Sequence, residues 1–264
     1  WLDGDFDAVE GAFFHEWSQF RHVIGQCPLP SHWTRFRCMD WGSFYPFYVG
    51  WFAYAAESWI HPSGKFIPQG SLILYREIYG SKADNNVGLK LPADVVGRMI
   101  AQNDLQDKIA YGVLDPSAFK QDVGTGNAER MARATEGKVY FRKADNARTG
   151  KDGAMGGWDE MRSRLRGIEI KGSNDTLPTL YIMDNCPTPI RIIPLAQHKK
   201  DHLEDLEIPE AHCLDAIRYG CMSRPWGQPL PPPMGPLRDI RDATFDELVK
   251  EKIQRDKRSK REYI

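Results

Sequence analysis

The sequence predicts an α/β domain built on a mixed β-sheet with helices on both faces, and two features of its pattern lead there. First, three strand-like runs follow one another with short turns between them, at residues 35–40, 47–56 and 71–79. Short connections of this kind join antiparallel neighbours. Second, a helical pattern at residues 91–102 precedes a mainly apolar run at 109–115. An apolar strand that follows a helix is typical of a buried, parallel position.

The first strand ends in a carboxylate, Asp40, which is followed by Trp41 and Gly42. The next strand begins close behind, so Asp40 lies near a hairpin turn. An aspartate in such a place often serves the turn itself, because its side chain bonds the nearby backbone. The residues around Asp40 alone therefore favour a turn residue over a catalytic one.

The later elements are expected to alternate between helices and short strands. Apolar spacing and end signals predict helices at residues 127–136 (closed by Gly137), 158–165 and 210–224. Short strands are expected at residues 138–142 and, as a pair around residues 186–189, within residues 179–194.

Aromatic residues crowd the first 34 positions. Four large apolar residues are spaced as on one face of a helix: Val9, Phe13, Trp17 and Phe20. Such a stripe is more often packed into a core than used to stack on a cofactor. Because the chain opens on Trp1 in mid-pattern, we expect residues 1–34 to lead in from a preceding domain.

Composition is that of an ordinary soluble globular protein, with 41% hydrophobic and 27% charged residues. The chain has no run of about 18 apolar residues and no basic-then-apolar leader, so neither a membrane span nor a signal peptide is expected. Its five cysteines include no CxxC pair, which fits a reducing compartment better than a disulfide framework. The formal net charge of −1 argues only weakly against DNA binding, because a basic face can coexist with an acidic site.

Three acids at element ends form the candidate site: Asp40, Asp115 and Asp215. Asp215 is about 100° round the last helix from Leu214, at the rim of its apolar face. Gathered carboxylates repel one another unless a cation neutralises them. Oxygen ligands that leave open positions suit Mg²⁺ or Mn²⁺, and two such ions about 4 Å apart can activate water for phosphodiester cleavage. Spacing alone does not establish convergence, since the 36 acids of the chain offer many triples.

Several short motifs occur in an informative order. They are Gly4-Asp-Phe-Asp7 with Gly11-Ala-Phe-Phe14, Met39-Asp-Trp-Gly42, Leu114-Asp-Pro-Ser117, Lys143-Ala-Asp-Asn146 with Arg148, and His212-Cys-Leu-Asp-Ala-Ile-Arg-Tyr219 with Met222-Ser-Arg-Pro225. Together, over roughly residues 1–225, they resemble the C-terminal nuclease half of the large terminase subunit of tailed bacteriophages. The resemblance implies a ribonuclease H-like fold and metal-dependent, sequence-tolerant cutting of concatemeric phage DNA. It also implies that Asp40, Asp115 and Asp215 hold Mg²⁺ or Mn²⁺, as two ions.

The chain departs from the family pattern just before the last helix, where related sequences often carry more acids and this one has Glu210-Ala-His212. Whether Glu204, Asp205 or His212 joins the metal site is left open. Glu77 is a further candidate, although a charge on the solvent face of a strand is the simpler interpretation. The glycine-rich residues 149–157 lack the GxxxxGK[ST] pattern of a Walker loop, so this chain is not expected to translocate DNA by itself.

Three basic residues beside these glycines, Lys143, Arg148 and Lys151, are predicted to contact DNA phosphates. The alternative is an ordinary solvated surface loop.

The predicted division is an N-terminal segment at 1–34, a nuclease domain at 35–224, and a proline-rich linker with a charged tail at 225–264. The partners that the resemblance implies are double-stranded DNA, a terminase ATPase domain in the same full-length chain, the small terminase subunit and the portal protein, with no membrane. They place the protein in the host cytoplasm and, transiently, at the procapsid portal. Two alternatives remain: another ribonuclease H-like nuclease, such as a junction resolvase or an RNA–DNA hybrid nuclease, and a non-catalytic module that docks on the portal or capsid.

Overall fold

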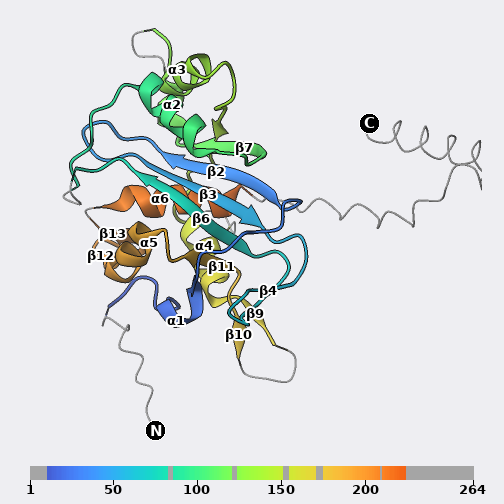
Figure 1. The fold of residues 1–264 in the computed structure, drawn as a ribbon. Helices are drawn as coiled ribbons and strands as arrows, with labels where there is room; N and C mark the ends of the chain where they lie inside the picture. The colour runs from blue at the N-terminus through green and yellow to red at the C-terminus, as the bar shows by residue number, and fades with distance from the viewer. Residues whose placement is uncertain are drawn as a thin grey trace, which may run out of the picture. The chain divides into compact units, whose positions relative to one another are not determined.

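A mixed β-sheet organises the computed structural model, which describes residues 11–82, 86–120, 124–150, 155–170, 175–208 and 210–223 (Figure 1). Among these residues seven strands pair in the order β1-β11-β6-β3-β2-β7-β8. Their bounds are β1 Val23–Ile24, β2 Thr34–Asp40, β3 Tyr48–Tyr54, β6 Leu72–Tyr79, β7 Ile109–Leu114, β8 Arg142–Lys143 and β11 Leu180–Met183. Strand β3 runs antiparallel to both β2 and β6, and the other pairs are parallel. The predicted antiparallel run of three strands and the parallel fourth strand are therefore confirmed.

Helices cover the two faces of this sheet. On one face lie α2 (Ala93–Asn103) and α3 (Asn127–Ala134), which pack with the sheet around Met39 and Trp51. On the other lie α4 (Gly157–Arg166), α5 (Pro187–Ile192) and α6 (Ala211–Met222) (Figure 1). The predicted helices at 91–102, 127–136, 158–165 and 210–224 are confirmed with small shifts at their ends.

Strand β2 is buried on both faces from Phe36 to Asp40. Because side chains alternate along a strand, Phe36, Cys38 and Asp40 share the face that α6 covers, whereas Met39 packs on the α2 side. This alternation places the carboxylate of Asp40 under α6.

A β-bulge in β6 changes which side chains face α6. The β3–β6 register shifts between Trp51 and Phe52, so that Phe52 pairs with Leu74 and Trp51 with Arg76. A bulge inserts one residue and reverses the alternation beyond it. Arg76 then lies over Trp51 on the α2 face, and Glu77 turns to the α6 face.

Smaller elements complete the described chain. They are α1 Gln19–His22, the hairpins β4–β5 (Trp59–Ile60, Phe66–Ile67), β9–β10 (Ile168–Glu169, Thr176–Leu177) and β12–β13 (Gln197–Lys199, His202–Glu207), and the 3-10 turns Pro116–Phe119 and Ile193–Leu195. No helix within the described ranges is long and apolar enough to cross a membrane.

The expected helical stripe at the start of the chain is wrong for the residues that the structure describes. Phe13 and Trp17 are buried, but neither lies in a helix, and Phe20 is 88% exposed. Tertiary contacts shape this segment instead: the Phe13 amide donates to the Ala196 carbonyl at 2.8 Å, and Trp17 stacks on His22. Val9 lies outside the described residues.

Two strand predictions also fail. Residues 179–194 form one strand, β11, followed by helix α5 rather than by a second strand. Pro187 stands at the first helical position of α5, where its fixed φ favours a helix and its missing N–H costs nothing. The strand expected at 138–142 is only β8, two residues long. The Val139 amide is already taken by the Thr135 hydroxyl, which closes the end of α3.

Candidate active site

Asp40 and Asp115 lie side by side at the carboxyl ends of two parallel strands. Strands β2 and β7 are in register up to the pair Met39 and Leu114, and each acid is the next residue. The Asp115 amide donates to the Met39 carbonyl at 3.2 Å, which ties the two strand ends together. Asp115 also caps the following 3-10 turn, since its Oδ1 accepts the Ser117 amide at 2.6 Å. Both acids therefore lie at the same end of the sheet.

Asp215 reaches this end of the sheet from α6, which packs closely on the sheet. A Cβ added at Gly220 would lie 2.8 Å from the Phe52 ring, so only glycine allows this approach. Asp215 is 8% exposed, and Tyr219 follows it at the i+4 position on the same side of the helix. The Tyr219 hydroxyl donates to Asp115 Oδ2 at 2.9 Å and lies 3.4 Å from Asp40 Oδ1. One residue of α6 thus connects both strand-end carboxylates.

The electrostatics of this cluster favour a cation. Burial raises the pKa of Asp40; a hydrogen bond with His212 opposes this, and the negative charges of Asp215 and Asp115 add to it. Burial and the neighbouring carboxylates likewise raise the pKa of the Tyr219 hydroxyl. The protein alone therefore does not fully compensate the negative charge at Asp40.

Arginines hold Asp215 in this structure. Arg218, which is 1% exposed, donates to Asp215 Oδ1 from Nη2 at 2.8 Å and from Nε at 3.2 Å. Arg148 Nη1 lies 3.4 Å from Asp215 Oδ2, and its Nε donates to Asp205 at 2.9 Å. Trp158 also donates to Asp205, at 2.8 Å. Asp205 therefore orients the Arg148 guanidinium that contacts Asp215.

The donor set has the chemistry that Mg²⁺ or Mn²⁺ requires, because three carboxylates offer hard oxygen ligands in one region. As the side chains stand, however, no group of three or more His, Cys, Asp or Glu residues in the described ranges is gathered closely enough to hold a metal ion. The cause is visible in the contacts: the Tyr219 hydroxyl binds both strand-end acids, and two arginines take up Asp215.

The sequence left open whether Glu204, Asp205 or His212 belongs to this cluster, and the structure gives the three residues different contacts. His212 joins the cluster, since its Nδ1 lies 2.6 Å from Asp40 Oδ2. Asp205 contacts the cluster indirectly, through Arg148 and Trp158, and Glu204 is exposed.

Glu77 does not point into solvent, which corrects the simpler interpretation given above. Its Oε2 accepts the Tyr48 hydroxyl at 2.9 Å, and its Oε1 accepts both the amide and the hydroxyl of Thr188. Burial raises the pKa of Glu77, and these hydrogen bonds oppose the shift. The bulge in β6 is the reason for its orientation, so Glu77 anchors α5 to the sheet.

Of the predicted phosphate contacts, Lys143 lies at the same sheet edge as the acids. It pairs in register with Leu114 and is exposed. Arg148 is partly buried and already bound to two carboxylates. Lys151 lies outside the described residues.

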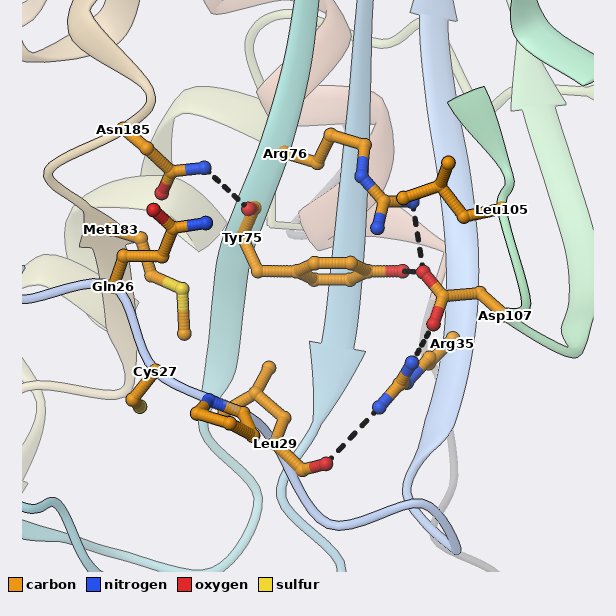
Figure 2. Close-up of a pocket in the computed structure, with 11 residues that line it drawn as sticks. Gln26, Cys27, Leu29, Arg35, Tyr75, Arg76, Leu105, Asp107, Met183 and Asn185 are labelled. Atoms are coloured by element: carbon orange, nitrogen blue, oxygen red, sulfur yellow. Dashed lines mark hydrogen bonds and ion pairs between the residues drawn. The ribbon is translucent and has the colours of Figure 1, made fainter. Parts of the chain in front are cut away.

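Two cavities differ in their relation to this cluster. One of about 480 Å³ is lined by Arg148 and the β12–β13 hairpin. Another of about 560 Å³ lies at the opposite end of β2, beside Arg35. Figure 2 shows that Arg35, Arg76 and the Tyr75 hydroxyl all converge there on Asp107. The Asp107 charge is thus compensated internally, and the group ties β2, β6 and the start of β7 together. The larger cavity is not where the carboxylates gather.

Sequence reasoning missed Arg218 and Tyr219 as parts of the site. A usable signal exists, because they stand three and four residues after Asp215 and so share its side of α6.

Comparison with known proteins identifies the fold. No family model matches the chain, and no curated protein does either. Among solved structures, the large terminase of a thermophilic bacteriophage is similar, with a TM-score of 0.58 at 15% identity over 81% of this chain and 45% of that one. The complex of that terminase with ADP gives a TM-score of 0.56 at 17% identity, over 79% and 44%. The P22 large terminase nuclease domain gives 0.53 at 16% identity, over 81% of this chain and 92% of the domain.

The chain thus spans less than half of the thermophilic phage terminase but nearly all of a terminase nuclease domain. Its mixed sheet with helices on both faces is the fold of that domain, and the predicted ribonuclease H-like class is confirmed.

Proposed function

We propose that this chain is a metal-dependent DNA endonuclease that cuts concatemeric viral DNA during genome packaging. Besides the fold, one observation supports this proposal. Asp40 and Asp115 lie at the ends of adjacent parallel strands and both contact the hydroxyl of Tyr219, which lies one helical turn after Asp215 on α6. A sheet edge with three carboxylates is costly without a cation to neutralise it.

Asp40, Asp115 and Asp215 would hold one or two Mg²⁺ or Mn²⁺ ions. When bound, such ions activate water and stabilise the leaving oxygen of a phosphodiester. No nucleophile from the protein is needed for this reaction.

The chain's own residues orient the ligands. His212 fixes one oxygen of Asp40, and the Ser117 amide fixes one oxygen of Asp115. Arg218 does the same for Asp215 from the buried side. Arg148 is the contact that must loosen if Asp215 is to turn toward the strand-end acids, because it is less buried than Arg218 and holds Asp215 at the longer distance of 3.4 Å.

DNA would approach over Lys143, Arg148 and Lys151, which are proposed to contact phosphates. Neutralising each residue that makes such a contact lowers the slope of log affinity against log salt by roughly 0.9. In a full-length protein, the proposed partners are an ATPase domain, the small terminase subunit and the portal protein, in the host cytoplasm and at the procapsid portal.

The test is nicking of supercoiled plasmid by the 264-residue chain with Mn²⁺, with Mg²⁺ and in EDTA. We expect cutting only with metal, and a loss of roughly 100-fold or more in Asp40→Asn, Asp115→Asn and Asp215→Asn, because each removes a charged metal ligand. Asp159→Asn, an exposed acid on α4, is the matched control and should cut like the wild type. Substantial cutting by any of the three site variants would remove that residue from the proposal.

Substrate comparison separates the alternatives. Faster cleavage of an RNA–DNA hybrid or a four-way junction than of plain duplex would favour a different nuclease of this fold. An intact plasmid under all metal conditions would favour a non-catalytic docking module.

A further inference from the structure

Two exposed aromatic side chains stand beside the carboxylate cluster. They belong to the loop at residues 42–46, which closely follows Asp40. Phe44 is 63% exposed and Tyr45 is 52% exposed. The two rings are adjacent and lie beside the site, and contiguous exposed apolar side chains of this kind are typical of contact surfaces.

The loop is joined to the site at both ends. Asp40 precedes it and Tyr48 follows it, and these two residues pair with each other across β2 and β3. The Tyr45 ring lies 5.8 Å from the His212 ring, and His212 contacts Asp40 at 2.6 Å. One side chain, that of His212, therefore separates Tyr45 from Asp40.

The loop is also held in place. The Gly88 amide donates to the Phe44 carbonyl at 2.8 Å, and a Cβ added at Gly88 would lie 2.4 Å from the Ser43 carbonyl oxygen. The neighbouring segment thus packs against the loop without any gap for a side chain. The backbone that carries the two aromatic rings is therefore held by the segment around Gly88.

Positive charge accompanies the exposed rings. The Lys90 ammonium group lies 5.2 Å from the centre of the Phe44 ring, and Lys90 is exposed. Lys82, on the same neighbouring segment, is exposed too. Aromatic faces combined with lysines match a polyanion that carries flat bases and sugars, whereas an apolar protein surface would leave the lysines unpaired.

We propose that Phe44 and Tyr45 form a wedge that enters a groove of duplex DNA beside the phosphate to be cut, with Lys90 on the adjacent backbone. This inference rests on the proposed nuclease function. Carboxylates repel phosphates, so DNA that reaches Asp40 must be held by contacts next to it. Apolar side chains inserted at base steps supply such a hold without sequence specificity.

The experiment measures binding of a fluorescent mixed-sequence duplex to the 264-residue chain in Ca²⁺, and plasmid nicking in Mn²⁺. Phe44→Ser/Tyr45→Ser should weaken duplex binding by roughly tenfold or more, the loss expected when stacking contacts are removed, without changing its salt dependence. Lys90→Gln should reduce the salt slope by roughly 0.9. A duplex with 2-aminopurine at successive positions should brighten at one step on binding wild type, and not on binding the double variant.

Phe20→Ser is the matched control. Phe20 is 88% exposed and also carries a lysine ammonium group, that of Lys65, at 5.8 Å from its ring. It precedes β1 at the far edge of the sheet, four strands away from β2. This variant should bind and cut like the wild type.

The outcomes separate the two proposals. A double variant that binds DNA as tightly as the wild type overturns the wedge, whether or not the wild type cuts. A wild type that binds DNA but never cuts overturns the nuclease, and the wedge is still decided by the binding data. A wild type that fails to bind duplex DNA overturns the wedge outright.

Discussion

Asp40, Asp115 and Asp215 are chemically the same, but the structure gives them different surroundings. Asp40 is buried, and its pKa is raised by that burial and by its acidic neighbours. Asp215 is buried to the same extent but is bound by two arginines. In the absence of metal, replacing Asp40 by Asn relieves repulsion, whereas replacing Asp215 by Asn leaves Arg218 without its partner. Replacement of any of the three aspartates by Asn should abolish cutting. In the absence of metal, Asp40→Asn should stabilise the fold and Asp215→Asn should destabilise it.

Glu77 offers a pH-dependent test at a residue outside the proposed metal site. Its folded pKa is raised above the unfolded value of 4.5 by burial. The folded protein therefore binds the Glu77 proton more tightly, and the stability that Glu77 contributes is lost as the pH rises from 4.5 through its folded pKa. Glu77→Gln has no charge to bury, and it can keep its contacts with Tyr48 and Thr188. We expect the Tm of the variant to exceed that of the wild type at about pH 7 to 8. Near about pH 4 the two Tm values should be equal.

The measurement is thermal unfolding of both proteins in EDTA across this range. A gain of about 1 kcal/mol would raise Tm by roughly 2–4 °C for a domain of this size. Glu169→Gln, at an exposed position, should show no pH-dependent difference. A Glu77→Gln variant that is less stable than the wild type at about pH 8 would show that the charged hydrogen bonds outweigh burial.

At the level of single residues, the sequence predicted the three aspartates but not their partners. An acid at the end of an apolar strand is visible in a linear pattern, as Asp115 is. The contact between His212 and Asp40 joins positions 172 residues apart, and nothing in either local sequence specifies it. The orientation of Glu77 depends on a bulge, which leaves no clear mark in the alternation of β6.

Helix α6 is the element on which the site depends most. Asp215, Arg218 and Tyr219 lie at positions i, i+3 and i+4, so one face of the helix presents an acid, a cation and a hydroxyl. Arg218 also packs against the Trp158 ring of α4, at 5.0 Å from its centre, and donates to the Ala147 carbonyl. The side chain is a buried ion held by a carboxylate, a carbonyl and an aromatic face.

Arg218→Met should therefore be strongly destabilising. Breaking a buried ion pair by removing one partner costs about 3–5 kcal/mol, because the other charge stays buried and unpaired. The double variant Arg218→Met/Asp215→Asn should recover part of that loss. Urea unfolding in EDTA of the wild type, both single variants and the double variant gives the coupling energy directly.

Arg133→Met is the control, because Arg133 also pairs with an acid on its own helix, Glu129, but is 69% exposed. An exposed pair of this kind contributes less than about 1 kcal/mol. Equal losses in Arg133→Met and Arg218→Met would contradict the view that burial makes the Arg218 pair important.

At the level of elements, predictions held where local signals and tertiary packing agreed. The β2–β3 hairpin and helices α2, α3, α4 and α6 have clear apolar patterns with Pro or Gly near their ends. Residues 187–192 were misassigned because a short apolar run is compatible with a strand or a helix, and Pro187 decided the matter. The first described residues follow contacts with Ala196 and His22 that no local pattern encodes.

Considered as a whole, the described chain forms a mixed sheet in which the parallel pair β2 and β7, next to the edge strand β8, carries the site at its carboxyl ends. Such ends are where parallel strands of open α/β sheets place their ligands. The solved terminases share this fold at 15 to 17% identity.

The last prediction concerns residues 225–264, which lie outside the described residues. Six prolines between positions 225 and 236 lack amide donors and fix φ, so neither a helix interior nor a central strand suits them. The described fold reaches its last contacts at Ser223, whose Oγ lies 3.0 Å from the Tyr111 hydroxyl and whose carbonyl accepts Arg142 at 3.2 Å.

Truncation after Arg224 keeps every one of these contacts. We therefore expect metal-dependent nicking to be unchanged and Tm to move by no more than about 2 °C, a shift worth under about 1 kcal/mol, while packaging by a full-length protein with the same deletion fails. Truncation after Tyr219 is the matched comparison. It removes the buried Cys221 and both Ser223 contacts, so it should lower Tm clearly and reduce nicking by loosening Tyr219. If the longer truncated chain instead loses several kcal/mol of stability, the tail belongs to the fold and is not a segment reserved for a partner.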